Sequence, residues 1–420
     1  RTVSEMTTAK GYTEMKDSGI QWIGQIPTHW LLKKAKYCVS ITNGSDPKSE
    51  GSVPVYGSGS ESFKTCGEYK EGPAVLIGRK GATLHIPHYI EGRYWNVDTA
   101  FDVKPQEGFS LRYYYYLACV FDYNYYISQT TLPGMTQTNY NNMKLPCPSL
   151  DEQSAIAAYL DTQCAKIDEI IDQAKASMED YKQWKASIIY EAVTKGLNPN
   201  VEMKDSGVEW IGKVPKEWKA IPLKVCTSKI GSGKTPQGGA ETYQDNGVLF
   251  LRSQNVYNTG LELDGVYYIS DEIDSTMKNS RVRYNDVLLN ITGGSIGRCC
   301  LFDLPDTAAN VNQHVCIIRT KPEILLPQFL RYFWNSAAGP MVIDQYQTGS
   351  NRQGLNFEQI GATHIPLCSI AEQRQIVAML DQKCAVIDQL MAEKQSLIDD
   401  LESYKKSLIY EVVTGKRYIR

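Results

Sequence analysis

The side chains of this sequence that are best suited to chemistry are those that hydrogen-bond to the edges of DNA bases. Arginine pairs with guanine through two hydrogen bonds, and asparagine or glutamine pairs with adenine in the same way. Such side chains gather in the second half of the chain, close to predicted turns. The expected DNA contacts in this half are Asn290, Thr292, Ser295, Arg298, Asn312, Gln313, Gln347, Asn351, Arg352 and Gln353.

The first half of the chain carries counterparts of these residues, again close to predicted turns. The net charge of −3 argues weakly against nucleic-acid binding, but phosphate attraction depends on the local potential rather than on the chain total. Basic residues do cluster in the divergent parts of the chain, as at Lys33, Lys34 and Lys36. The expected DNA contacts in the first half are Arg79, Lys80, Thr83, Thr136, Gln137 and Asn139.

Residue patterns typical of enzymes are scarce. The chain has five histidines, which leaves few candidates for acid–base catalysis. Its 11 cysteines form no CxxC pair and no spaced Cys/His set, so we expect reduced, buried thiols and no metal site. GSGKTP at 231–236 resembles a phosphate-binding loop, but Ser228 replaces its first glycine and Pro236 interrupts the helix that should follow. We therefore expect no catalytic residue and no cofactor.

A tyrosine-rich stretch, RYYYY at 112–116, allows two interpretations. Its rings could stack on unpaired bases. They could also form one face of an amphipathic helix and pack in a core. We favour the helix, because aromatic residues in such a pattern more often serve packing.

Two nearly identical strings indicate that the chain is built from a duplicated unit. MKDSGIQWIGQIPTHW at 15–30 returns as MKDSGVEWIGKVPKEW at 203–218, and we call these two segments the leading strings. A second, longer repeat covers 145–196 and 365–416, while the regions between the repeats barely resemble each other. This tandem plan predicts two equivalent copies of a shared frame that carry two divergent domains.

Each longer repeat predicts one long α-helix. No proline or glycine interrupts residues 152–191, apolar residues that include Trp184 recur there in steps of three, four and seven, and the C-terminal repeat has the same stripe, which includes Tyr404. Gly196 and Gly415 follow the two stripes, where a left-handed residue is expected to end each helix. About forty residues at about 1.5 Å each make a rod of about 60 Å. The stripes could dimerise two chains, but two equivalent stripes in one chain favour antiparallel pairing within the molecule.

The divergent regions share a faint pattern of branched apolar strands and glycine turns. GPAVLIGRKGATLHI from Gly72 parallels NDVLLNITGGSIGRCCLF from Asn285, and Asn96 aligns with Asn310. Each region therefore predicts an α+β domain. The expected segments are 1–145 for the first leading string and domain, 146–198 for the central helix, 199–364 for the second string and domain, and 365–420 for the C-terminal helix.

Several short motifs, taken in order, point to a known family. They are WIG-x-[VI]-P-x-x-W at Trp22 and Trp210, P-x-x-x-E-Q from Pro148, LLNITGGSIGR from Leu288 and NQHVCIIR from Asn312. This arrangement resembles the specificity subunit of type I restriction-modification enzymes. The resemblance covers nearly the whole chain.

The resemblance implies both a fold and a role. Two α+β target recognition domains would be joined by two long helices that pair as an antiparallel coiled coil, with pseudo-twofold symmetry between the tandem copies. Each domain would read one half of a bipartite, asymmetric target in double-stranded DNA, and the helices would set the spacer. Methyltransferase subunits and restriction/translocase subunits would join the chain. S-adenosylmethionine and ATP belong to those partners, so this chain would be a non-catalytic subunit without a cofactor.

The partner surface is expected on the helices. Some positions repeat between the two copies although they lie off the main apolar stripe, which indicates a shared role other than helix pairing. The expected methyltransferase contacts are Glu152, Gln153, Tyr190, Glu372, Gln373 and Tyr410.

Three other functions remain open at this point. The chain could be a specificity subunit of a related methyltransferase or nuclease system outside type I, a nuclease with fused recognition domains, or an adaptor that bridges two proteins. The sequence has no apolar run long enough for a membrane span and no apolar signal core near its start. We therefore expect no membrane partner and a cytoplasmic location.

Overall fold

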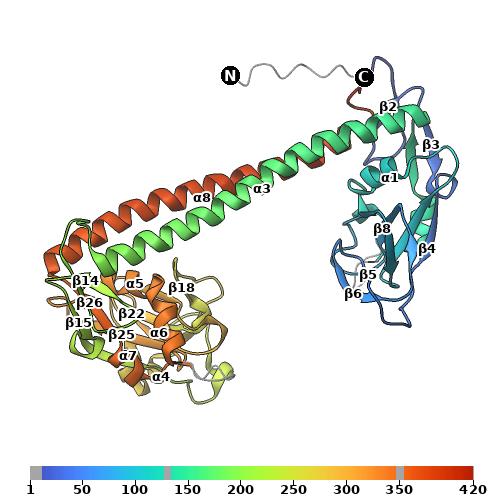
Figure 1. Cartoon of the computed structure of the whole chain (residues 1–420). Helices are drawn as coiled ribbons and strands as arrows, with labels where there is room; N and C mark the ends of the chain where they lie inside the picture. Colours follow the sequence, from blue (N-terminus) through green and yellow to red (C-terminus); the bar gives the residue numbers. More distant parts are fainter. Residues whose placement is uncertain (1–11, 127–133, 347–353, 420) are drawn as a thin grey trace. The chain divides into compact units, whose positions relative to one another are not determined.

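The computed structural model describes residues 12–126, 134–346 and 354–419, and the chain divides into two compact units. Unit 1 comprises Arg1–Lys175 and Lys394–Arg420, and unit 2 comprises Ala176–Glu393. Each unit contains one leading string, one divergent region and one end of each long helix (Figure 1). The two units therefore share one plan, as the duplicated sequence predicts.

The two long helices are α3 (Leu150–Lys195) and α8 (Ile370–Val413), which lie where the longer repeats predict them. The apolar stripe is buried over much of each helix, as at Ile167. It is not buried throughout: the side chains of Trp184 and Tyr404 are 53% and 41% exposed. The prediction that these two aromatic residues belong to the packed stripe is therefore wrong.

Matching ion pairs fix the direction in which the helices run past each other within each unit. In unit 1, Lys405 of α8 lies 2.6 Å from Asp168 of α3. In unit 2, Lys185 of α3 lies 2.6 Å from Asp388 of α8. In both units the second half of one helix meets the first half of the other, which confirms the predicted antiparallel pairing.

Unit 1 builds its divergent region on two four-stranded sheets. The first contains, in spatial order, β4 (Val39–Asn43), β11 (Ala100–Pro105), β8 (Ala74–Gly78) and β9 (His88–Ile90). The second contains β6 (Ser62–Cys66), β5 (Val53–Tyr56), β10 (Arg93–Asn96) and β7 (Lys70–Glu71). Strands β5 and β10 run parallel, and the other neighbours run antiparallel. The short helices are α1 (Leu111–Ala118) and α2 (Gln137–Asn142).

Unit 2 repeats this topology with longer connections. Its first sheet contains β16 (Thr227–Ser232), β25 (Val315–Thr320), β22 (Val287–Asn290) and β23 (Cys299–Leu301). Its second contains β20 (Tyr267–Ile269), β17 (Val248–Leu251), β24 (Ala309–Val311) and β21 (Arg281–Val282), with β17 and β24 parallel. A small ribbon adds β18 (Val256–Tyr257) and β19 (Gly260–Leu261). The helices are α4 (Asp271–Thr276), α5 (Pro327–Asn335), α6 (Ala338–Tyr346) and α7 (Phe357–Ala362). The predicted α+β class is confirmed.

Short ribbons connect each divergent region to the helices. In unit 1 the leading string forms the hairpin of β1 (Met15–Asp17) and β2 (Gln25–Pro27), and β3 (Leu31–Lys34) pairs with β12 (Lys144–Cys147). In unit 2 the corresponding pairs are β13 (Met203–Asp205) with β14 (Lys213–Pro215), and β15 (Lys219–Pro222) with β26 (His364–Leu367). The chain thus enters and leaves each divergent region through one two-stranded ribbon.

Two glycines end the helical repeats against the leading strings. Gly196 and Gly415 have φ angles of 77° and 73°, the left-handed conformation predicted for both. A Cβ at Gly415 would lie 2.3 Å from Pro27, and one at Gly196 would lie 3.1 Å from the ring of Trp218. Close packing on the leading string therefore adds a second reason for glycine at these ends.

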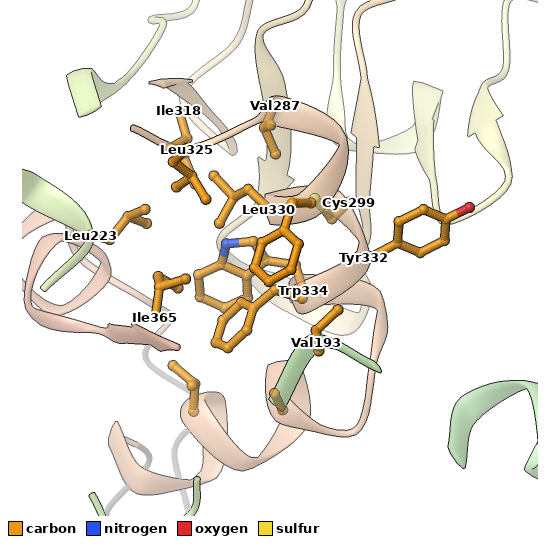
Figure 2. Packing of buried hydrophobic residues seen from close by; sticks show 14 of the residues in the cluster. Val193, Leu223, Val287, Cys299, Ile318, Leu325, Leu330, Tyr332, Trp334 and Ile365 are labelled. Carbon is orange, nitrogen blue, oxygen red and sulfur yellow. The ribbon is translucent and has the colours of Figure 1, made fainter. Parts of the chain in front are cut away.

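One buried cluster of unit 2 joins the end of α3 to α5 and to the first sheet. Figure 2 shows part of this cluster, in which Trp334 and Leu330 of α5 meet Val193 of α3 and the sheet residues Val287 and Ile318. All five side chains are at most 2% exposed. The end of α3 is therefore part of the core of unit 2 and is not a free helix.

The tyrosine-rich stretch is an amphipathic helix, as favoured above. It forms α1, in which Tyr113, Tyr114 and Tyr116 are buried. The cysteines among the described residues are free thiols, and all except Cys119 are buried, as expected. Within that part of the chain, no helix is both long and apolar enough to cross a membrane, and no cluster of His, Cys, Asp and Glu suits a metal ion.

Candidate nucleic-acid interface

In unit 2 the ends of several strands bring loops to one edge of the sheets. The amide of Ile291, just after β22, donates to the carbonyl of His314 at 3.0 Å. The amide of Leu355 donates to Ile291 at 2.9 Å, and that of Asn312, after β24, donates to Leu251 at 3.0 Å. We call this cluster the unit 2 loop edge; it comprises residues 233–235, 252–255, 291–298, 312–314 and 354–356.

A chain of hydrogen bonds orders side chains at the unit 2 loop edge. The hydroxyl of Thr235 donates to Oε1 of Gln313 at 2.6 Å, and Nε2 of Gln313 lies 3.1 Å from Nε2 of His314. Nδ1 of His314 lies 2.6 Å from the hydroxyl of Thr292. Because the amide of Gln313 donates to Nε2, the imidazole proton sits on Nδ1 and is donated to Thr292. The exposed Gln313 is thus held in one orientation.

Two arginines at this edge lie on tyrosine rings. The guanidinium carbon of Arg298 is 4.5 Å from the ring centre of Tyr257. That of Arg252 is 4.3 Å from the ring centre of Tyr267, which itself stacks on Tyr243 at 4.9 Å. Such stacking fixes the plane of a guanidinium group while its hydrogen-bonding edge stays available.

Unit 1 has the same loop framework at the matching edge. The amide of Arg79, after β8, donates to Thr99 at 2.8 Å, and that of Met135 donates to Arg79 at 2.8 Å. The amide of Val97, after β10, donates to Tyr56 at 3.0 Å. We call this cluster the unit 1 loop edge; it comprises residues 57–59, 79–84, 97–99 and 134–135.

The side chains on the unit 1 loop edge differ in character from those of unit 2. Nζ of Lys80 lies 3.0 Å from the carboxylate of Asp98, and Arg79 approaches the carbonyl of Asp98 at 3.4 Å. The hydroxyls of Thr83 and Ser58 lie 2.8 Å apart. The Lys80–Asp98 pair is about half exposed, so it contributes little to stability and can reorganise around a ligand. Equivalent frameworks thus present different chemistry in the two units.

A single glycine explains the sequence that resembled a phosphate-binding loop. A Cβ at Gly233 would lie 1.6 Å from the carbonyl oxygen of Val311, and the Gly233 amide donates to Asn312 at 3.1 Å. The corresponding Gly44 of unit 1 has the same constraint, because its Cβ would lie 2.1 Å from the carbonyl of Val97. Gly233 therefore allows the chain after β16 to pass close to the end of β24. No helix begins at Pro236, as a phosphate-binding loop would require.

Seven of the residues expected to contact DNA lie at the loop edges with exposed or half-exposed side chains. For these positions the expectation stands as a proposal. They are Arg79, Lys80 and Thr83 in unit 1, and Thr292, Ser295, Arg298 and Gln313 in unit 2.

Two asparagines of the expected set are buried and need correction. Asn290 is 0% exposed, and its Nδ2 donates to the carbonyl of Ser253 at 2.7 Å. Asn312 is 8% exposed, and its Oδ1 accepts from the amide of His314 at 3.1 Å. Both amides position the loops and cannot meet a base edge in this conformation.

The polar groups expected from α2 also serve the fold. The side-chain Nε2 of Gln137 donates to the carbonyl of Ile41, and the side-chain Nδ2 of Asn139 donates to the carbonyl of Tyr126 at 2.9 Å. The hydroxyl of Thr136 caps the helix by accepting from the backbone amide of Asn139 at 3.0 Å. These bonds account for the three residues without DNA. The other expected contacts, Gln347, Asn351, Arg352 and Gln353, lie outside the described residues.

Several residues at the loop edges were not anticipated from the sequence. They include Arg252, Thr235 and His314 in unit 2 and Ser58 in unit 1. Arg252 had one usable signal: it directly follows VLFL, an apolar run typical of a buried strand, and strand ends carry binding residues in many folds. No signal in the sequence indicated the contacts between loops that are distant along the chain.

Asn96 and Asn310, which occupy matching positions in the two divergent regions, are both buried beneath the loop edges. Nδ2 of Asn310 donates to Asp274 at 2.9 Å, while Nδ2 of Asn96 donates to the carbonyl of Ala100 at 2.9 Å. Burial acts to raise the pKa of Asp274, but hydrogen bonds from Arg281 and Asn310 hold that pKa below its usual value. The side-chain amides of these two asparagines therefore support the fold of their own units.

The glutamines expected to bind a partner are buried instead. Gln153 and Gln373 are 1% and 0% exposed. Oε1 of Gln153 accepts from the amide of Ser110 at 2.8 Å, and Oε1 of Gln373 accepts from that of Leu326 at 2.9 Å. Each glutamine ties the start of a long helix to its divergent region, so neither can form part of a docking surface.

The repeated glutamates and tyrosines hold the leading strings. Glu152 accepts from the indole of Trp30 at 3.0 Å, and Glu372 accepts from Trp218 at 3.1 Å. In unit 1, Tyr12 also donates to Glu152; burial and then this hydrogen bond raise the pKa of Tyr12 far above its usual value.

The tyrosines near the helix ends complete this attachment. The hydroxyl of Tyr410 donates to the carbonyl of Trp22 at 2.9 Å, and that of Tyr190 donates to Trp210 at 3.2 Å. The leading string recurs because each unit fastens it to the same two helices. These internal bonds give the repeated glutamates and tyrosines a role within each unit, and partner binding at these half-exposed residues stays a prediction.

We expect the substitution Gln373→Leu to lower the free energy of unfolding by about 1–3 kcal/mol, because it leaves the buried amide of Leu326 without an acceptor. Nε2 of Gln373 also serves two carbonyls, those of Ile324 and Cys368. Urea unfolding of the whole chain measures the change. Gln389→Leu on the exposed side of the same helix is the control, with an expected change within about 0.5 kcal/mol. Equal losses in the two variants would contradict the role of Gln373.

Comparison with known proteins agrees with the duplicated plan. The domain family described as "Type I restriction modification DNA specificity domain" matches the chain twice, over residues 35–179 and 215–399. Each match covers most of one divergent region and much of the long helix that follows it.

Similar whole proteins are also found. The type I restriction enzyme EcoBI specificity subunit of Escherichia coli is 26% identical over 416 residues, which cover 91% of this chain and 84% of the relative. The MjaVIII specificity subunit of Methanocaldococcus jannaschii is 25% identical over 270 residues, covering 63% and 61%. A solved chain described as "Structural basis underlying complex assembly and conformational transition of the type I R-M system" has a TM-score of 0.70 at 15% identity, covering 92% of this chain and 98% of that one. At this identity the structural likeness supports the fold alone.

Proposed function

Because the chain belongs to the type I restriction modification DNA specificity family, we propose that it is the DNA-recognition subunit of a type I restriction-modification complex, in which each unit reads one half of a bipartite, asymmetric target. The observation that carries this proposal is the pair of loop edges. They share one backbone framework, yet one exposes a lysine–aspartate pair and the other exposes a glutamine and two stacked arginines. Equivalent frames with different side chains suit the recognition of two different half-sites.

The chain is a non-catalytic subunit that recognises DNA sequence. It binds double-stranded DNA and assembles with the methyltransferase and restriction subunits that perform the chemistry. We propose the cytoplasm as its place of action, because a DNA-recognition subunit must reach DNA. The related systems outside type I, a fused nuclease and a protein adaptor are less well supported, because none of them explains the two matches to this one family.

The division of labour along the chain follows from the same proposal. The target recognition domains occupy 1–145 and 199–364, together with their leading strings, and the helices at 146–198 and 365–420 space them. The base contacts come from the exposed residues of the two loop edges.

The proposal is tested by binding of the assembled methyltransferase complex to a library of random duplexes. We expect enrichment of one bipartite motif, with two defined half-sites and a gap of fixed length. The affinity for that motif should fall steeply as salt is raised, because phosphate contacts release counterions.

The controls separate the rival functions. Scrambling either half-site should return the affinity to the non-specific level, about 10³-fold weaker or more. The chain without its partners should not cleave or methylate DNA in the presence of magnesium and S-adenosylmethionine. Enrichment of no motif by the complex, or cleavage by the chain alone, would overturn the proposal.

A further inference from the structure

We propose that Arg252 and Arg298 each read a guanine in the half-site that unit 2 binds. This inference rests on the proposed function and deepens it, because it names the side chains that determine specificity and the base that they select. Arg252 does not belong to the set of residues expected from the sequence. Arg298 belongs to that set, but the sequence indicates neither the base that it reads nor the geometry of the contact.

The first argument is the location of both side chains. Arg252 directly follows β17, and the parallel neighbour β24 ends at the same edge, where the amide of Asn312 donates to Leu251. Arg298 closes the loop between β22 and β23. The buried Asn290 connects these two places, because its Nδ2 donates to the carbonyl of Ser253 at 2.7 Å. Both arginines therefore lie on the unit 2 loop edge.

The second argument is the stacking. Arg252 lies on Tyr267 and Arg298 lies on Tyr257, with distances of 4.3 and 4.5 Å to the ring centres. The two tyrosines are 40% and 37% exposed, so the arginines cover rings at the surface and are not drawn into a core. A guanidinium group held flat in this way loses little further freedom when it forms two parallel hydrogen bonds.

The third argument comes from the other arginines that stack on tyrosine. Three of them also form an ion pair with a carboxylate, which accounts for their orientation. They are Arg93 with Glu71 at 3.8 Å, Arg112 with Asp161 at 2.6 Å and Arg331 with Asp381 at 3.5 Å. Among the described residues, neither Arg252 nor Arg298 forms an ion pair with a carboxylate.

The fourth argument concerns a buried donor. Nε of Arg252 is buried and has no hydrogen-bond partner among the described residues. A polar group in that state costs free energy, and natural proteins keep few of them. Arg331 has the same buried Nε without a partner in the described part of the chain, and a buried nitrogen cannot reach a base edge, so the terminal Nη groups of Arg252 are the donors that remain for a ligand.

Guanine is the base that fits this arrangement. Its O6 and N7 are two acceptors side by side in the major groove, and they match the two donors on one edge of a guanidinium group. A phosphate would also accept these hydrogen bonds, but it would carry no sequence information. The experiment must therefore separate a contact to guanine from a contact to phosphate.

The test uses the assembled methyltransferase complex and duplexes in which 7-deazaguanine replaces one guanine of the unit 2 half-site at a time. This analogue lacks the N7 acceptor. We expect the wild-type complex to lose affinity about tenfold at one position because of Arg252 and at another because of Arg298. In Arg252→Ala the loss at the first position should disappear while the loss at the second remains, and Arg298→Ala should show the reverse.

Matched controls make the result interpretable. Arg283→Ala removes an exposed arginine of unit 2 that has no stacking partner among the described residues, and it should leave both 7-deazaguanine effects unchanged. If Arg252→Ala does not fold, Tyr267→Leu keeps the guanidinium group and removes only its support. It should reduce the effect at the first position alone.

Two outcomes would overturn the inference. One is an arginine variant that weakens binding equally to all sequences and keeps the full 7-deazaguanine effect, which indicates a phosphate contact. The other is a wild-type complex that selects its bipartite target but tolerates 7-deazaguanine throughout the unit 2 half-site. In both cases the proposed function survives. That function fails only if the wild-type complex shows no sequence preference at all.

Discussion

Replacing residues 223–363 with the corresponding segment of another family member is expected to change one half of the recognised DNA sequence completely and to leave the other half unchanged. The expected effect is large. A mismatched base pair costs about 1–3 kcal/mol, so a change at several positions abolishes binding to the old half-site.

The structure indicates where such an exchange can be joined. Strands β15 and β26 pair along their length, and the amide of Leu223 donates to the carbonyl of Thr363 at 2.8 Å. Both ends of the exchanged segment therefore meet at one ribbon, and the ribbon itself stays with the host chain. The recipient keeps the ties between its leading string and the helices, including the bond between Trp218 and Glu372.

Unit 1 offers a matched exchange. The amide of Ala35 donates to the carbonyl of Met143 at 2.7 Å, beside the ribbon of β3 and β12, so residues 35–143 form the equivalent segment. Exchange of that segment should alter the other half-site only. Methylome sequencing of cells that express each chimera with its methyltransferase gives the motif directly. A change in both half-sites from one exchange would show that the units do not read DNA independently.

A second large effect is expected from the helices, which we propose to act as the ruler between the half-sites. Inserting four residues into both α3 and α8 should widen the gap in the target by one or two base pairs and leave both half-sites unchanged. Four residues lengthen a helix by about 6 Å, and B-DNA rises about 3.4 Å per base pair.

The position of the insertion follows from the ion pairs. One links Asp168 to Lys405 within unit 1, and the other links Lys185 to Asp388 within unit 2. Insertions between these pairs, in both helices, preserve each pair inside its own unit. An insertion after Lys195 would not lengthen the ruler, because the preceding turn of α3 already packs in the core of unit 2.

The control is an insertion into α3 alone. Since the partner helix keeps its length, the two ion pairs can no longer form together, and we expect weaker methylation instead of a wider gap. Methylome sequencing again provides the measurement. If the double insertion leaves the original gap in the methylated motif, the helices do not measure the spacing and the ruler proposal is wrong.

The frame of this protein can be predicted from its sequence alone. The repeated strings and the long apolar stripes are periodic signals within contiguous stretches, and such signals depend on local geometry alone. They predicted two copies of an α+β domain, two long antiparallel helices and the glycine ends at Gly196 and Gly415. RYYYY was interpreted correctly for the same reason, since the pattern of a short amphipathic helix is complete within a few residues.

Which polar residues are free to bind a ligand depends on tertiary packing. Asn290 and Asn312 have the side chains of base readers, yet strand packing buries both and gives their amides internal partners. Gln153 and Gln373 repeat between the copies because each ties a helix to its own domain. Burial and hydrogen bonding arise from segments that are distant along the chain, so residue type and spacing could not reveal them.

The same reason explains what was missed. The sequence shows Arg252 only as one arginine after a strand, and nothing local connects it to Tyr267 or to the loop that carries Arg298. The parallel pairing of β17 with β24 brings these residues to one edge, and that pairing is a property of the whole sheet. The sequence thus determined what frame this protein builds, whereas only the folded sheets decided which side chains the frame presents, because exposure is set by contacts between segments far apart in the chain.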